Sequence, residues 1–326
     1  MKLLQNQPRR VVLRDWAFRK IRLRDREMFI EFQKQCDYPL NLWSANFDYL
    51  WADSQSREKK VMWRIVDGML VPFVLMRKGG LHLVCLPFGK GTAEQVLQTV
   101  YRCLRFCNRW NRGNGFSMAT IRTVNAAQLE FLQQSDKMGK YFDVMQIRGK
   151  ERHFGIQNLV KLAGKDFARI REAINKFKRE HPTLTVRRYT DEDFRKLLRV
   201  NENWRKTAGK KYSLIFDGVY FEQILKRHKE LEHIILVVEI DEKIVGMVTG
   251  GLTPAGNAWG CLTKRLEGYN GINEFMMVEF AREINRVDPS AELLNVGSDL
   301  GVPGLVAFKE KFRPVLSLER YRVRLK

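Results

Sequence analysis

The sequence predicts an α/β (α+β) protein of two similar domains, each a mixed, mostly antiparallel sheet flanked by helices. Its 326 residues are too many for one small core, so two domains of about 150 residues each are expected. The hydrophobic fraction of 44% and the charged fraction of 29% are those of an ordinary folded protein. One order of patterns (strand, hairpin, strand, glycine loop, helix, strand, helix) occurs twice along the chain. We therefore predict a first domain at 1–149 and a second, carrying the active site, at 150–326.

The first repeat is recognised by its hairpin and its glycine loop. The Asp-Gly pair at 67–68 separates two apolar runs and is the strongest short hairpin signal in the chain. The Phe-Gly-Lys-Gly loop at 88–91 follows a third strand and opens a long helix. The aromatic-rich segment 38–52 is expected to pack mostly in the core, with base stacking as an alternative. The predicted strands are 11–13, 61–66, 69–75, 81–87, 116–124 and 142–147, and the predicted helices are 24–35, 92–110 and 126–133.

The second repeat has the same order of signals. Two apolar runs flank a turn at 241–242, a third strand follows the Pro-Ala-Gly-Asn turn at 254–257, and a glycine-containing loop at 264–271 opens a helix. Two further helices precede this meander. The predicted strands are 234–240, 243–252, 258–263 and 292–296, and the predicted helices are 162–181, 191–206, 272–286 and 304–312.

The basic helix predicted at 162–181 is amphipathic. Lys165, Arg169 and Lys176 are expected on its outer face, towards solvent or a polyanion. Arg171 and Asn175 lie one turn apart beside the apolar stripe, which suggests that this helix lines a pocket. The alternative is a surface helix on which Arg171 extends over the rim of the core. The apolar stripe itself has 3-4-3 spacing and consists of Phe167, Ile170, Ile174 and Phe177.

The charge balance points to a polyanionic partner. The formal net charge of +21 favours tRNA, DNA or an anionic lipid surface, and charge alone does not choose among them. No run of about 18 apolar residues predicts a membrane span, and no secretion signal is recognised at the N-terminus. The five cysteines form no CxxC pair and the five histidines lack metal-ligand spacing, so we expect no metal site and a reducing, cytoplasmic compartment. Cys103 and Cys107, one helical turn apart, are expected to be packing residues.

A meander that feeds a glycine loop and a helix, followed by a strand and a helix, resembles the GNAT acyltransferase fold. In that fold the backbone N–H groups of the loop and the helix dipole hold the pyrophosphate of coenzyme A. The corresponding donor loop here is Arg265-x-x-Gly268-x-x-Gly271, one residue longer than the usual loop. An acyl-CoA-dependent N-acyltransferase is therefore an alternative function. A non-catalytic tRNA- or lipid-binding module with a degenerate loop is another.

Three segments together carry a closer resemblance, to the phosphatidylglycerol lysyltransferase C-terminal domain family, the catalytic part of the multiple-peptide-resistance-factor proteins. Their order and spacing cover almost the whole chain. The segments are Asn46-Phe47 with Leu50-Trp51, then Leu162-x-Gly164-Lys165-x-x-x-x-x-Arg171-x-x-x-Asn175-x-Phe177, then Asn295-x-x-x-Asp299-Leu300-Gly301-x-x-Gly304-Leu305-x-x-x-Lys309-x-x-Phe312-x-Pro314.

The resemblance implies two tandem GNAT-like domains that move an amino acid from aminoacyl-tRNA to a lipid hydroxyl or another small acceptor. Aminoacyl-tRNA is then the partner and donor, and no cofactor is needed because its ester is already activated. Peripheral contact with anionic lipid at the inner face of the membrane is expected if the acceptor is phosphatidylglycerol.

The catalytic residues expected from this resemblance are Asp299, Lys309 and Arg171. Arg171 and Lys309 would contact phosphate or the oxyanion that forms at the ester carbonyl. Asp299 would orient the acceptor, act as a general base or bind the aminoacyl ammonium, and a structural cap is the alternative. Glu274 would hold the α-ammonium or simply complement the helix dipole. The full set of expected substrate-binding residues is Asn175, Glu274, Asn295, Lys165, Arg169, Arg205 and Tyr212. Arg205 and Tyr212 belong to a basic-aromatic cluster with Trp204, Lys206, Lys210 and Lys211.

Overall fold

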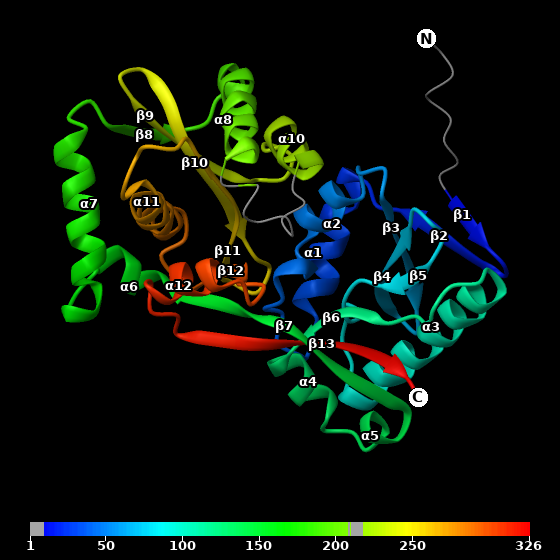
Figure 1. Ribbon diagram of the computed structural model, residues 1–326. Helices are drawn as coiled ribbons and strands as arrows, with labels where there is room; N and C mark the ends of the chain where they lie inside the picture. Colours follow the sequence, from blue (N-terminus) through cyan, green and yellow to red (C-terminus); the bar gives the residue numbers. More distant parts are fainter. Residues whose placement is uncertain (1–9, 208, 210–217) are drawn as a thin grey trace, which may run out of the picture. The chain divides into compact units, whose positions relative to one another are not determined.

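The computed structural model describes residues 10–207, 209 and 218–326, and the chain divides into two compact units (Figure 1). The first unit runs to Arg148 and also contains Leu318–Lys326, whereas the second is Gly149–Ser317. The last residues of the chain thus belong to the first unit, whereas the predicted domains, 1–149 and 150–326, place them in the second. The physical reason is a strand at the C-terminus that the sequence analysis did not predict.

The first unit is a sheet with helices packed against it. Two strands, β7 and β13, cross the boundary between the units along the chain. The elements are β1 (Arg10–Leu13), β2 (Trp16–Lys20), α1 (Arg26–Lys34), α2 (Phe47–Asp53), β3 (Lys59–Val66), β4 (Met69–Met76), β5 (Leu81–Leu83), α3 (Ala93–Gly113), β6 (Ile121–Asn125), α4 (Ala126–Leu132), α5 (Lys137–Tyr141), β7 (Phe142–Gly155) and β13 (Leu316–Leu325).

The sheet of the first unit has the strand order β1-β2-β3-β4-β5-β6-β13. Only the β5–β6 pair is parallel among these neighbours, so the sheet is mixed and mostly antiparallel, as predicted. Strand β13 pairs with β6 through Tyr321 opposite Val124. This pairing explains why the last residues belong to the first unit. The alternation of apolar and polar residues at 316–325 was the sequence signal for β13.

The predicted hairpin at 67–68 is confirmed, and a capping residue explains where the predicted helix at 92–110 begins. Asp67 and Gly68 both have positive φ, 50° and 78°, which is the backbone of a tight two-residue hairpin turn. Thr92 caps α3 by accepting a hydrogen bond from the Gln95 N–H, and the Gln95 side-chain oxygen accepts one from the Thr92 N–H. Helix α3 buries one face in the core, including Cys103, which confirms the packing role expected for that thiol.

The second unit has the same plan. Its sheet runs β7-β12-β11-β10-β9-β8, with only β11–β12 parallel among these neighbours. Figure 1 shows α11 and α8 on opposite faces of this sheet. The elements are α6 (Ile156–Lys161), α7 (Ala168–Glu180), β8 (Thr185–Arg188), α8 (Phe194–Lys206), α10 (Gly218–Lys226), β9 (Ile234–Ile240), β10 (Lys243–Leu252), β11 (Ala258–Arg265), α11 (Ile272–Val287), β12 (Leu293–Ser298) and α12 (Pro303–Glu310).

Glycines let α11 approach β10 closely. A Cβ atom at Gly246 would lie 2.8 Å from the Met276 sulfur, and one at Gly250 would lie 2.7 Å from the Phe280 ring. Met247 and Thr249, which alternate with these glycines along β10, therefore point to the opposite face, where α8 packs.

The helix predicted at 162–181 begins later, and that prediction is corrected at its N-terminal end. Leu162 ends α6 in the left-handed conformation (φ 47°), and Gly164 follows with φ 79°. These two residues break the helix, so α7 begins at Ala168 after a short 3₁₀ turn. The glycine was the available sequence signal.

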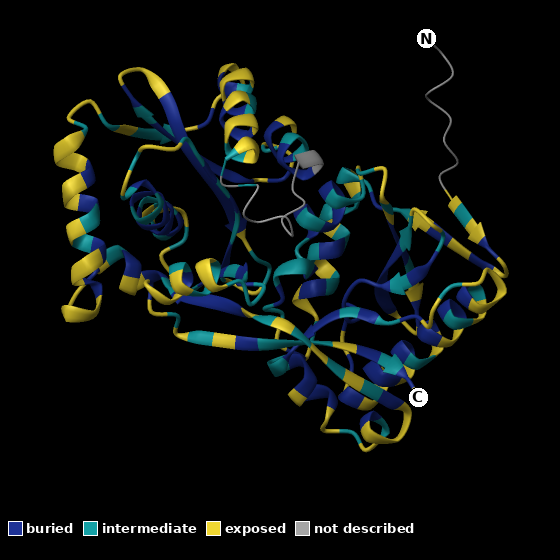
Figure 2. Ribbon diagram, in the orientation of Figure 1, coloured by how far each residue is buried: buried dark blue, intermediate teal, exposed yellow. Residues whose placement is uncertain are grey.

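Each unit has a cluster of buried apolar residues, and Figure 2 shows buried segments in both units. Within the aromatic segment 38–52, Phe47, Leu50 and Trp51 are buried, which confirms their predicted packing role. The apolar stripe of α7 is buried in the second core, as predicted. No helix in the described ranges is long and apolar enough to cross a membrane.

Candidate functional site

The loop segment 296–302, made of the last residues of β12 and the turn that leads into α12, is the best-defined polar structure of the second unit. Gly297, Leu300 and Gly301 all have positive φ, between 53° and 70°, so the chain turns sharply here. The Asn295 side chain, buried in β12, accepts a hydrogen bond from the Gly297 N–H (2.8 Å). The loop follows a central strand of the sheet and leads into a helix, and its course is therefore anchored at both ends.

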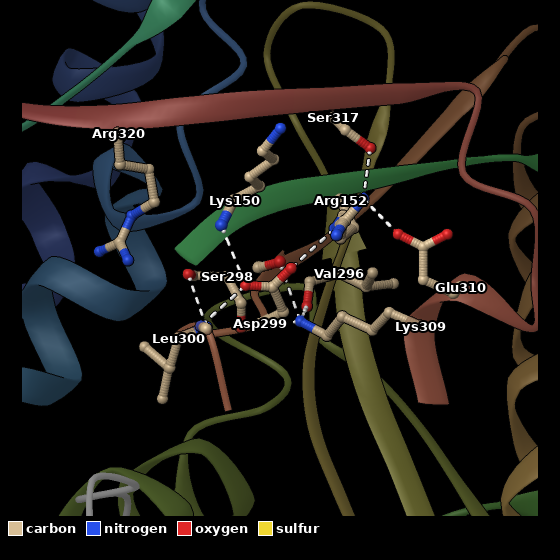
Figure 3. Close-up of polar contacts among 12 residues, drawn as sticks. Lys150, Arg152, Val296, Ser298, Asp299, Leu300, Lys309, Glu310, Ser317 and Arg320 are labelled. Atoms are coloured by element: carbon tan, nitrogen blue, oxygen red, sulfur yellow. Dashed lines mark hydrogen bonds and ion pairs between the residues drawn. The ribbon is translucent and has the colours of Figure 1, made fainter. Parts of the chain in front are cut away.

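Asp299 joins this loop to β7 (Figure 3). Its side chain is buried and accepts hydrogen bonds from the Lys150 N–H (3.0 Å), the Gly301 N–H (2.9 Å) and Arg152 Nε (2.8 Å). The Asp299 N–H in turn donates to the Lys150 carbonyl (3.0 Å). Burial alone would raise the pKa of this carboxyl, but these hydrogen bonds outweigh burial and hold the pKa below its usual value. Asp299 is therefore a carboxylate at neutral pH.

Arg152 is a site residue that the sequence analysis missed. Besides Asp299, it donates to Ser317 Oγ (2.9 Å) and forms an ion pair with Glu310 Oε1 of α12 (2.9 Å). It is buried at the end of β7, where the sequence Glu-Arg-His-Phe is buried at every position. The first part of β7 alternates between polar and apolar residues, but its last part buries four residues in succession. Periodicity does not predict this burial, because charged residues such as arginine are normally exposed.

Lys309 holds the same loop from α12. Its ammonium donates to three successive carbonyl oxygens, those of Val296 (2.7 Å), Gly297 (2.9 Å) and Ser298 (2.9 Å). An ammonium has three donor hydrogens, so these contacts use them all. The buried Lys309 ammonium thereby supplies hydrogen-bond donors to carbonyl oxygens of the sharp turn.

The structure thus brings Asp299 and Lys309 to one loop, but their charged atoms bind that loop itself. The sequence analysis assigned them a direct part in catalysis, which remains a prediction. Three hydrogen bonds hold the Asp299 carboxylate and three hold the Lys309 ammonium, and together they stabilise the course of this loop. Held from both sides, the loop is preorganised in the way that a catalytic site requires.

Arg171 lies in a different part of the second unit. Its guanidinium donates to the carbonyl oxygens of Leu162 and of Gly164, the latter at 2.7 Å. It therefore closes the turn between α6 and α7. Asn175, one turn further along α7, is exposed. The pair expected to line a pocket thus divides into a turn-binding arginine and a surface asparagine.

We expect Arg171→Met to destabilise the second unit by about 1 kcal/mol, because two carbonyls of the turn lose a charged donor. Urea denaturation followed by circular dichroism measures this change. Arg169→Met, two residues earlier on the exposed face, should change the free energy of unfolding by less than about 0.5 kcal/mol. Equal stability of the two variants would show that the turn contacts of Arg171 are unimportant.

The predicted donor loop is tightly packed by α7. A Cβ atom at Gly271, the N-cap of α11, would lie 2.7 Å from the Ala173 carbonyl oxygen and 3.2 Å from Phe177 Cβ. A Cβ atom at Gly268 would meet nothing within 4 Å, and Arg265 donates to the Leu266 carbonyl (3.1 Å). Helix α7 therefore packs closely against the first residues of α11 on the side where a side chain at position 271 would lie.

The other predicted substrate-binding residues are dispersed. Glu274 lies in the first turn of α11 and forms an ion pair with Lys311 (3.2 Å). Lys165, Arg169 and Arg205 are exposed. Tyr212 lies outside the described residues, as do Lys210 and Lys211.

A second polar group lies where α8 packs on the sheet, and the sequence analysis did not predict it. The ammonium of buried Lys264 stands 3.2 Å from the centre of the Trp204 ring. Thr249 Oγ and Asn201 Oδ1 are buried at the same α8-facing side, and neither atom has a hydrogen-bond partner among the described residues. Within the described ranges, no three His, Cys, Asp or Glu side chains gather as a metal-binding group.

Comparison with known proteins gives both a family and a fold. The family model described as phosphatidylglycerol lysyltransferase, C-terminal, matches residues 54–324. No curated protein matches the sequence.

Solved structures share the fold over almost the whole chain. A conserved protein of unknown function from Bacteroides thetaiotaomicron has a TM-score of 0.78 at 20% identity, covering 95% of this chain and 99% of that one. L-PGS from Bacillus licheniformis has a TM-score of 0.63 at 16% identity, covering 94% and 92%. A tandem GNAT protein from the clavulanic acid biosynthesis pathway has a TM-score of 0.52 at 9% identity, covering 94% and 98%. These likenesses confirm the predicted tandem GNAT-like architecture.

Proposed function

Because this chain belongs to the family of phosphatidylglycerol lysyltransferase C-terminal domains, we propose that it transfers an amino acid from aminoacyl-tRNA to a lipid hydroxyl. The observation that carries the proposal is the family match, which covers residues 54–324 and so includes the loop at 296–302. Lysyl-tRNA and phosphatidylglycerol are the substrates to test first, since the family is named for them.

The proposed reaction exchanges one ester for another. The acceptor hydroxyl oxygen attacks the carbonyl carbon of the aminoacyl ester, and a tetrahedral oxyanion forms. The bond from this carbon to the terminal ribose oxygen of tRNA then breaks, and the proton of the acceptor hydroxyl ends on that ribose oxygen. No oxidant, reductant or further activation is needed, so the protein's task is to bind, orient and stabilise charge.

The structure supports this proposal through its charge and its loop. The net charge of +21 suits a polyanionic donor. Arg152, Asp299 and Lys309 fix the loop after β12, and we propose that this loop positions the reacting groups. In this proposal Asp299 and Lys309 act through the loop backbone and do not take up the proton themselves.

The acyl-CoA alternative is less well supported. A GNAT donor loop needs open space in front of the helix N-terminus for a pyrophosphate. Here α7 packs so closely on the start of α11 that a Cβ atom at Gly271 would meet the Ala173 carbonyl and Phe177. An aminoacyl-tRNA donor has no pyrophosphate to place there, and this favours the proposed reaction.

We expect the purified chain, mixed with radiolabelled lysyl-tRNA and vesicles containing phosphatidylglycerol, to produce labelled lipid that thin-layer chromatography resolves. Omitting either substrate should abolish the product. Arginyl-, alanyl- and other aminoacyl-tRNAs in parallel reactions identify the amino acid. Water-soluble acceptors in place of vesicles test for a non-lipid acceptor.

Two outcomes would contradict the proposal. One is the absence of any aminoacylated product with every charged tRNA. The other is tight binding of acetyl-CoA in calorimetry that a bulky residue at Gly268 abolishes, which would favour the acyl-CoA alternative. Gly268 is a suitable position for this variant because its surroundings are open, although its φ of 93° adds backbone strain.

A further inference from the structure

Helix α3 of the first unit carries a row of arginines that have no part in the proposed site at 296–302. Arg102, Arg105, Arg109 and Arg112 have 3-4-3 spacing and are all exposed, so they form one stripe, here called the arginine stripe. The buried face of α3 lies between the exposed positions, as the alternating bands on this helix in Figure 2 show. From Arg102 to Arg112 the stripe rises by about 15 Å along the helix axis.

Little negative charge neutralises the arginine stripe. From residue 95 to residue 129 the sequence contains no Asp or Glu. Arg102 forms an ion pair with Asp67 (2.6 Å), whereas Arg105 and Arg109 lie over aromatic rings, those of Tyr101 and Phe106. Such packing holds the guanidinium planes close to the helix surface without removing their charge.

A further cation extends the arginine stripe at its C-terminal end. The guanidinium of Arg14, in the turn between β1 and β2, lies 2.6 Å from where a Cβ atom of Gly113 would be. Two separate elements of the first unit thus direct arginines to one end of α3, next to Arg112.

The basic row of α7 differs in this respect. Lys176 pairs with Glu180 (3.8 Å), and Asp166 lies in the same segment and pairs with Arg313 (3.7 Å). Carboxylates therefore lie among the cations of the segment 165–180, and its attraction for a polyanion is correspondingly weaker.

We propose that the arginine stripe is the surface that binds the phosphate backbone of RNA. This inference rests on the proposed function, because it takes the donor tRNA as the partner. One strand of B-form DNA presents a phosphate about every 3.4 Å along its axis; with this spacing as a guide, about 15 Å of helix spans roughly four phosphates. Guanidinium groups bind phosphate through paired N–H donors.

An anionic membrane fits the arginine stripe less well. Helices that lie in a membrane surface insert large apolar side chains between their cations. Among the described residues, the large apolar side chains that are strongly exposed are Val12, Ile65, Met118, Tyr141, Val144, Leu252, Val287 and Val315, and none of these lies on α3. The polar residues Gln98 and Asn108 lie beside the arginine stripe instead.

The test measures binding of fluorescently labelled, uncharged tRNA to the full chain between about 50 and about 200 mM salt. In R105Q/R109Q/R112Q, the slope of log K against log salt should be smaller by about 2–3, and affinity at about 0.1 M salt weaker on the order of 100-fold. R105K/R109K/R112K keeps the charges and should keep the slope, which separates lost charge from altered folding.

Two control variants remove three charges elsewhere. K226Q/R227Q/K229Q removes cations that pair with Glu222, Glu230 and Asp191, and it should leave the slope unchanged. K165Q/R169Q/K176Q tests the row of α7, and its slope should change less than that of the α3 variant.

Wild-type slope and affinity in R105Q/R109Q/R112Q would overturn the inference, as would a larger effect from the α7 variant. So would a loss of binding to phosphatidylglycerol vesicles with tRNA binding intact. A failure of the proposed function looks different: tRNA then binds through the arginine stripe, and no labelled lipid forms with any charged tRNA.

Discussion

Lys309→Met should lower the free energy of unfolding by about 3 kcal/mol, because three carbonyl oxygens lose their charged donor in a buried loop. Methionine fills a similar volume, so little of this loss reflects packing. Transfer of the amino acid should fall by about 100-fold, as expected when a loop that positions reacting groups shifts by about 1 Å. Urea denaturation and the labelled-lipid assay measure the two effects.

Lys311→Met is the matched control for this prediction. Lys311 lies just after α12, and its ammonium pairs with Glu274 at an exposed position. Its loss should cost less than about 1 kcal/mol and leave transfer nearly unchanged. If the Lys309 and Lys311 variants were equally stable and equally active, the loop contacts of Lys309 would have no positioning role.

Asp299→Asn should also destabilise the protein by about 3 kcal/mol at neutral pH. The amide keeps one acceptor oxygen but presents an N–H group to Arg152 Nε, so two donors face each other and a buried guanidinium loses its closest carboxylate. We expect transfer of the amino acid to fall together with stability. The denaturation midpoint at pH 7 measures the loss of stability, and the labelled-lipid assay measures the loss of transfer.

The effect of Asp299→Asn should depend on pH in one direction. The folded-state pKa of Asp299 lies below the value in the unfolded chain, about 3.9. Its stabilisation is therefore fully present above about pH 4 and is lost as the pH falls through the folded-state pKa. The difference in stability between wild type and variant should stay constant from about pH 5 to 8 and narrow below about pH 4.

Asp288→Asn supplies the comparison for the Asp299 prediction. Asp288 is half-buried just after α11, and hydrogen bonds from the side chain and backbone of Ser290 lower its pKa. Because solvent replaces these contacts readily, the change in stability should be far smaller than for Asp299. An Asp299 variant as stable as the Asp288 variant at pH 7 would refute the buried network as a source of stability.

Local sequence signals were sufficient for most elements. The strand predictions at 234–240 and 243–252 coincide with β9 and β10, since a continuous apolar run bounded by turn residues has few other structures. The Asp-Gly turn at 67–68 and the Thr92 cap were readable because each depends on residues within three positions of one another. Caps and tight turns are stabilised by contacts between residues a few positions apart, so a short stretch of sequence is enough to predict them.

The break before α7 and the final strand were harder to predict. Gly164 was visible in the sequence, but the left-handed Leu162 beside it was not, because leucine is a good helix former. Strand β13 alternates as a strand should, yet only its pairing with β6 shows that it returns to the first unit. Pairing of residues so far apart in the chain leaves no local signature.

The sequence by itself determined the duplicated plan and the family. It also predicted that Asp299 and Lys309 belong to one site within the segment 295–312. Only the tertiary structure decided what their charged atoms do, because their partners are Arg152 and Lys150 of β7 and the carbonyls of a turned loop. A buried charge must be satisfied by whatever groups the fold brings to it, and those groups can lie far away in the sequence. The direction in which a side chain points is therefore a property of the folded chain.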